Sequence, residues 1–99
     1  MLNKNTILEL NRSVLKRFEP NLGDGTVFLF NVENETFWSG NVAVDCFLRF
    51  IDGKLTLGEI YSSLLEIFED YSEEEVIQSY NEIINELIKK EFLVVINAV

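Results

Sequence analysis

The sequence has no histidine, one cysteine and one proline in 99 residues. General acid-base and nucleophilic catalysis usually depend on a histidine, a paired carboxylate or an activated thiol. The one thiol, Cys46, falls on the apolar side of a predicted helix and is interpreted as a small core residue. A single cysteine also makes neither an internal disulfide nor a metal cluster, so nothing indicates an oxidising compartment.

Glycine is also scarce, and none of the five glycines forms a phosphate-binding loop between a strand and a helix. The acidic residues lack the spacing and the central glycine of a calcium loop. We therefore expect no catalytic residues, no metal site and no cofactor, and we predict that the chain is not an enzyme.

Long apolar runs are missing, although 47% of the residues are hydrophobic. No stretch reaches the roughly 18 uncharged positions that a membrane span requires. The N-terminus, MLNKNTILELNRSV, contains a glutamate and several asparagines where a signal peptide would be apolar. These features predict a cytoplasmic protein without a membrane partner.

Basic residues number 8 against 17 acidic ones, which gives a net charge of −9. This charge repels phosphates and predicts that nucleic acid is not a partner. The acids concentrate in EIFEDYSEEE, residues 66–75, whereas residues 1–20 carry a net charge of +2. The acidic run is typical of a solvated helix start and loop, and the alternative is a docking surface for a basic partner.

The first half of the chain predicts a small β-sheet in a single domain that spans residues 1–99. The only proline, Pro20, and the NLGDG that follows it indicate a boundary. The segment before it, around Val14 to Phe18, fits either a helix or a short strand. TVFLFNV, ENE and TFWSG then predict a β-hairpin. Because both faces of TVFLFNV are apolar, we expect an inner strand that is covered on both sides.

The second half predicts three helices. Asn41 is the expected N-cap of the first, which Asp52 and Gly53 end. Thr56 with Glu59, and Ser72 with Glu75, have the spacing of a capping box and predict where the next two helices begin. The expected inward positions are Ile60, Leu64, Ile67 and Phe68 in the second helix, and Val76, Ile77, Tyr80, Ile83, Ile84, Leu87 and Ile88 in the third. The strand-like FLVVI follows. The order predicts an α+β fold of the winged-helix type.

The stretch NVAVDCFLRFIDGKLTLGEIYSSLL resembles the PqqD family pattern. The likeness consists of an Asn that ends a strand, a helix, an Asp-Gly turn, a Thr cap and a Glu-Ile pair, carried by Asn41, Asp52, Gly53, Thr56, Glu59 and Ile60. It extends through EEVIQSYNEIINELIKKEFLVV and covers about residues 12–96. Two positions differ from the family, which often has an acid where Ser79 stands and a glycine where Glu91 stands.

This resemblance implies a precursor-peptide recognition element of RiPP biosynthesis. Such a module is a winged helix-turn-helix with a three-stranded antiparallel sheet and three α-helices. It binds the leader of a ribosomally made precursor peptide as an added strand, while a separate enzyme, often a radical SAM enzyme, modifies the core of that peptide. The alternatives are a winged-helix transcriptional regulator and an accessory subunit that stabilises an enzyme without touching substrate.

The expected peptide-binding residues follow from the order of the strands. If Val14 to Phe18 is the first strand, TFWSG lies at an edge of the sheet, where an incoming peptide finds free backbone groups. Strand side chains alternate, so either Phe37 or Trp38 faces the core, and Trp38 is interpreted as either a core residue or an interface anchor. The candidate site comprises Glu35, Thr36, Phe37, Trp38 and Ser39, with Tyr80, Ile83, Ile84 and Leu87 from the third helix.

Overall fold

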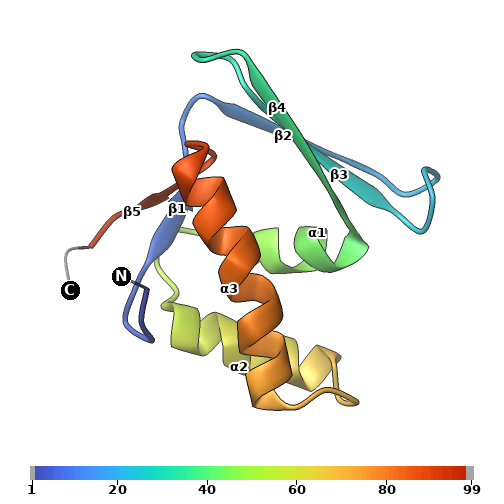
Figure 1. The fold of residues 1–99 in the computed structure, drawn as a ribbon, viewed down its shortest axis with the longest axis vertical. Coiled ribbons are helices and arrows are strands. Elements are labelled where there is room, and N and C mark those ends of the chain that lie inside the picture. The colour runs from blue at the N-terminus through green and yellow to red at the C-terminus, as the bar shows by residue number, and fades with distance from the viewer. Residues whose placement is uncertain (1, 98–99) are drawn as a thin grey trace.

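The computed structural model describes residues 2–97, and within them it contains five strands and three helices (Figure 1). The fold is α+β, as the sequence predicts. In chain order the elements are β1 (Leu8–Leu10), β2 (Val14–Glu19), β3 (Thr26–Asn31), β4 (Thr36–Asn41), α1 (Val42–Leu48), α2 (Leu57–Ile67), α3 (Glu73–Lys89) and β5 (Leu93–Val95).

Strands β2, β3 and β4 form an antiparallel sheet in that order. The segment around Val14 to Phe18, for which the sequence allowed either a helix or a strand, is therefore a strand. The predicted hairpin is confirmed. One row across the sheet consists of Leu15, Phe30 and Phe37. The chain turns between β3 and β4 through Glu35, whose φ is 57°. β3 lies in the middle, so β2 and β4 are the two edges.

All three predicted helix caps are confirmed. The Asn41 side chain accepts a hydrogen bond from the Val44 N–H at 3.2 Å. In α2 the Thr56 hydroxyl accepts from the Glu59 N–H at 3.3 Å, and the Glu59 carboxylate accepts from the Thr56 N–H at 2.9 Å. Ser72 and Glu75 make the same reciprocal pair at the start of α3. These side chains satisfy N–H groups that the first helical turn leaves free.

A second, two-stranded sheet joins the two ends of the described chain. β1 pairs with β5 in antiparallel register, with Leu8 opposite Val95. The side chain of Asn97 accepts a hydrogen bond from the Ile7 N–H at 2.8 Å and donates one to the Asn5 carbonyl at 2.7 Å. FLVVI is thus a strand in part, as expected. β1 was not anticipated, since three residues are too few to give a periodic signal.

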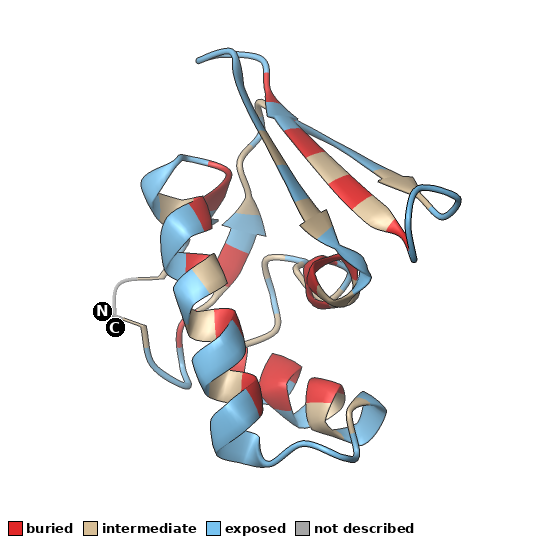
Figure 2. Cartoon of the chain, turned by 45° about the vertical axis from the view of Figure 1, so that its right-hand side comes forward, coloured by how far each residue is buried: buried red, intermediate tan, exposed pale blue. Residues whose placement is uncertain are grey.

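The core lies between the inner face of the three-stranded sheet and the helices. Val27 and Leu29 of β3 are fully buried there against Phe47 and Ile84. Figure 2 shows the alternation of buried and less buried residues along β3. The expectation that this strand is covered on both sides is wrong, because α1, α2 and α3 all lie on one side of the sheet (Figure 1).

Two helical positions also differ from the predicted stripes. Ile67 is 53% exposed, because α2 ends there and its last turn passes beyond the core. Cys46 is half-buried at the margin of the core rather than inside it. Burial raises the pKa of its thiol.

Candidate functional site

The edge strand β4 offers free backbone groups at alternate residues. The Val32 N–H donates to the Ser13 carbonyl at 2.9 Å, just beyond the ends of β2 and β3. In an antiparallel pair, hydrogen-bonded and non-hydrogen-bonded residue pairs alternate. Since Val32 bonds to β2, the backbone groups of Phe30 and Phe28 also bond to β2. The backbone groups of the residues between them, such as Leu29, therefore bond to β4.

The register of the second pair then assigns the groups of β4 itself. Leu29 lies opposite Trp38, so Trp38 bonds toward β3. Its neighbours Phe37 and Ser39 therefore direct their N–H and C=O groups away from the sheet. Both residues are exposed, and within residues 2–97 no further strand pairs with this edge. β4 can accept an added strand at these two residues.

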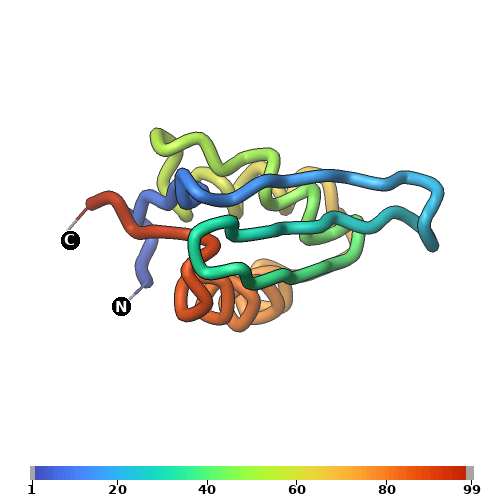
Figure 3. The backbone as a smooth tube through the Cα atoms, turned by 90° about the horizontal axis from the view of Figure 1, so that it is seen from above, coloured from blue at the N-terminus to red at the C-terminus, as the bar shows by residue number. Residues whose placement is uncertain are grey.

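Helix α3 runs beside the β4 edge, as the view from above shows (Figure 3). The Trp38 indole N–H crosses this space and donates to the Glu86 carboxylate at 2.6 Å. The indole ring covers Gly40, where a Cβ atom would lie only 2.6 Å from a ring carbon. Gly40 therefore allows Trp38 to lie flat along the strand. Trp38 is half-buried and joins the edge strand to α3.

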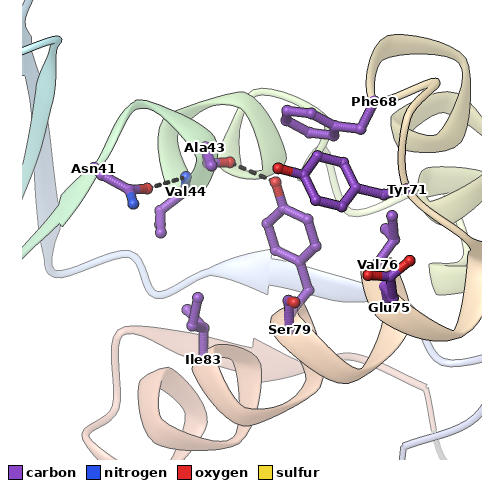
Figure 4. Close-up of a pocket in the computed structure, with 10 residues that line it drawn as sticks. Asn41, Ala43, Val44, Phe68, Tyr71, Glu75, Val76, Ser79 and Ile83 are labelled. Atoms are coloured by element: carbon purple, nitrogen blue, oxygen red, sulfur yellow. Dashed lines mark hydrogen bonds between the residues drawn. The ribbon is translucent and has the colours of Figure 1, made fainter.

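A pocket of about 290 Å³ lies where β4 passes into α1 (Figure 4). The end of α2, the loop after it and α3 form its other walls. The residues that line it are Asn41, Ala43, Val44, Phe68, Tyr71, Glu75, Val76, Ser79, Tyr80 and Ile83. Its walls are mainly apolar and aromatic, which suits the apolar side chains of a bound chain. We call this pocket, together with the neighbouring surface at Trp38 and Glu86, the groove.

One hydrogen bond fixes the back of the pocket. The Tyr80 hydroxyl donates to the Ala43 carbonyl at 2.7 Å and so connects α3 to α1. Burial raises the pKa of Tyr80 to about 12. The phenol therefore stays protonated and keeps donating at all ordinary pH values, which makes it a structural rather than a chemical group.

Two glutamates of α3 border the groove. Glu75 lies at the pocket, and Glu86 lies at the indole of Trp38, where its carboxylate also pairs with the Lys90 ammonium at 3.7 Å. Hydrogen bonds from the backbone and side chain of Ser72 lower the pKa of Glu75, so it is ionised at neutral pH. A segment that lies in this groove therefore meets apolar walls and a negatively charged rim.

The predicted site residues fall into three groups. Thr36, Phe37 and Ser39 are exposed along the edge and Trp38 is half-buried beside them, whereas Glu35 lies in the turn before β4 and is not part of the strand. Tyr80 and Ile83 line the pocket. Ile84 and Leu87 have no exposed surface and belong to the core.

The expectation that Ile84 and Leu87 line the groove is therefore corrected. Successive helical residues are about 100° apart around the axis, so Ile83 and Ile84 cannot both face the groove. The sequence also missed the contribution of α2. Phe68 and Tyr71 line the pocket, and Tyr71 is 57% exposed. The signal in the sequence was an aromatic residue inside the acidic run 66–75.

Neither metal chemistry nor a membrane span is indicated by the described residues. Among residues 2–97, no three side chains of His, Cys, Asp or Glu are grouped to hold a metal ion. The helices in this part of the chain are too short or too polar to cross a membrane. No family model, curated protein or solved structure matches the chain.

Proposed function

We propose that this chain binds the leader segment of a ribosomally made precursor peptide and presents it to a separate modifying enzyme, such as a radical SAM enzyme. In this proposal the chain is a PqqD-like winged helix-turn-helix module of RiPP biosynthesis. The observation that carries it is the position of a free strand edge, at Phe37 and Ser39, directly beside α3 and its apolar pocket.

The β4 edge suits a peptide better than the β2 edge does. At β4, Trp38 and the pocket residues offer surface for the side chains of an added strand. At β2, the Arg49 guanidinium lies over the Phe18 ring at 5.5 Å from its centre. Strand addition gains affinity from backbone hydrogen bonds and specificity from pockets. The pocket beside β4 lies between the sheet and the helices, whereas the hollow at β2 lies on the open outer face.

The groove also suggests what the leader looks like. Side chains of an added strand alternate between the two faces, so every second residue points toward α3. Those residues would be apolar where they meet Ile83 and the pocket, and basic where they meet Glu75; Glu86 already pairs with Lys90. The same acidic face opposes the alternative function as a DNA-binding regulator, since recognition helices need basic residues.

The test is a titration with the N-terminal segment of a candidate short precursor peptide, sought among the genes next to that of this chain, followed through Trp38 fluorescence. Phe37→Pro removes the backbone donor at the free edge and should weaken binding about tenfold or more, the equivalent of about 1.4 kcal/mol. Phe37→Ala removes the ring but keeps the N–H. Lys16→Pro removes an edge donor from β2, so binding should stay near that of the natural chain.

Backbone amide shifts locate the peptide independently. We expect shifts at residues 35–39 and 79–86 on adding the peptide. Shifts confined to residues 57–70 would contradict the proposal, as would equal losses for Phe37→Pro and Lys16→Pro. Parallel titrations with duplex DNA and with the modifying enzyme alone separate the regulator and the accessory subunit from the peptide carrier.

A further inference from the structure

The outer face of the three-stranded sheet is apolar and uncovered. Side chains that alternate with the buried residues point to it, and in residues 2–97 no helix or loop lies over them. Phe28 and Phe37 contact each other with their ring centres 5.7 Å apart. The exposed members are Leu15 (64%), Phe30 (36%), Val32 (50%) and Phe37 (64%). Aromatic residues are enriched where proteins bind one another, and contiguous apolar patches mark such sites.

This face carries little charge in a strongly acidic chain. Arg17 and Glu19 point to it and form an ion pair with each other, and Lys16 at the β2 edge also lines the hollow on this face. The chain as a whole carries −9. The groove side, in contrast, has the exposed Glu75. A strongly charged partner therefore finds little on the outer face that would select it.

We propose that the occupant of the outer face is a second copy of this chain, packed face to face in a two-fold dimer. Two copies that each carry −9 repel one another least where the contact surface lacks excess negative charge, as the outer face does. Arg17 and Glu19 are opposite charges two residues apart on one strand, so they can also pair across a two-fold axis. Two antiparallel sheets stack in this way about 10 Å apart in β-sandwiches.

The contact would be weak. Three strands of six residues cover roughly 14 by 20 Å, or about 300 Å², well below the ~800 Å² that each partner buries in a standard interface. We therefore expect a dimer that dissociates with a constant on the order of tens of micromolar or more. Stacked sheets keep both β4 edges open, so the dimer does not depend on the proposed function.

Sedimentation velocity from about 5 to 500 µM protein, at low and moderate salt, tests the proposal. The natural chain should shift from monomer to dimer over this range. Leu15→Lys and Arg17→Glu should each raise the dissociation constant tenfold or more, the first by placing charge in the apolar patch and the second by breaking the Arg17–Glu19 pair and adding negative charge. Ile67→Lys is the matched control, since Ile67 at the end of α2 is 53% exposed against 64% for Leu15, and it should leave the dimer unchanged.

Amide shifts on dilution should appear at residues 15, 17, 28, 30 and 37. A chain that stays monomeric at 500 µM would overturn the proposal. So would a dimer that Phe37→Pro abolishes and Leu15→Lys leaves intact, because it would be joined through its strand edges. Leu15→Lys should still bind the leader peptide. This result separates a failure of the dimer from a failure of peptide binding.

Discussion

The two faces of the central strand β3 have similar sequences and opposite environments. Val27 and Leu29 on the inner face have no exposed surface, whereas Phe30 on the outer face is 36% exposed. All of these residues are apolar, and the pattern alone predicted cover on both sides. The chain supplies helices for one side only. An apolar face therefore indicates a surface that will be buried. It does not indicate whether a helix of the same chain or another molecule buries it.

The largest expected effect is a difference in stability between these two faces. Leu29→Ala empties a fully buried position and should lower the free energy of unfolding by about 3 kcal/mol. Phe30→Ala removes a larger side chain from the open face, yet it should cost about 1 kcal/mol or less in the monomer. Urea unfolding at low protein concentration measures both. Equal losses would mean that the outer face is covered in the monomer.

The last residue of β3 on the inner face is polar. A second substitution measures how much this residue contributes to the free energy of unfolding. Asn31 is 1% exposed, and its side-chain amide donates to the Glu91 carbonyl at 3.0 Å. Its oxygen accepts from the Glu33 N–H at 3.0 Å, so it ties the β3–β4 turn to the end of α3.

Asn31→Ala should cost about 2 kcal/mol, because buried partners lose their hydrogen bonds. Asn34→Ala is the control at an exposed neighbour, whose amide reaches the Glu91 carboxylate at 3.1 Å. It should change the unfolding free energy by about 0.5 kcal/mol or less. A cost for Asn34→Ala as large as that for Asn31→Ala would show that burial is not what gives Asn31 its effect.

A smaller effect, of opposite sign, is expected where α3 ends beneath the sheet. Glu91 follows the C-cap with φ 67°, a left-handed conformation that favours glycine. The bonds from Asn11 and Asn31 go to its backbone carbonyl, so they survive a change of side chain, whereas the exposed bond from Asn34 to its carboxylate is lost. Relief of the strain should outweigh that exposed bond, so Glu91→Gly should stabilise the chain by about 0.5 kcal/mol, seen as a higher Tm. Glu91→Ala keeps the strain and should give no gain.

Most of the fold could be predicted from the sequence, because local chemistry determines it. Asn41, Thr56 and Ser72 set the helix starts through hydrogen bonds within three residues. The β1–β5 pair could not be predicted, since it joins residues more than 80 positions apart and its strands have three residues each.

The candidate site could be predicted only in part, for a similar reason. The edge position of the strand follows from strand order, and residues 36–39 of the predicted strand belong to it, whereas Glu35 lies in the turn. Which side of α3 faces the groove depends on the angle at which the helix packs, and the sequence assigned Ile84 and Leu87 to the wrong side. The contribution of Phe68 and Tyr71 depends on where α2 ends in space.

The smallest expected effect is the dependence of stability on pH at the start of α3, where Glu75 and Val76 line the pocket. The pKa of Glu75 lies below its ordinary value of 4.5, because the Ser72 backbone and hydroxyl hold its ionised form. A lowered pKa in the folded state means that ionised Glu75 stabilises the fold above pH 4.5. That contribution is lost as the pH falls from 4.5 through the lower folded pKa.

The measurement is the free energy of unfolding between pH 7 and pH 3 for the natural chain and Glu75→Gln. The difference between the two should be constant above pH 5 and should shrink below it, because glutamine does not titrate. Glu74→Gln removes an adjacent charge but keeps the capping box, so its curve should follow that of the natural chain through this interval. Since Asp52 also has a lowered pKa, from the N–H groups of Leu55 and Lys54, the natural chain loses further stability in acid. The comparison with Glu75→Gln isolates the contribution of the Ser72–Glu75 capping box to the free energy of unfolding. A difference that persists unchanged at pH 3 would show that this pair does not act through the carboxylate charge.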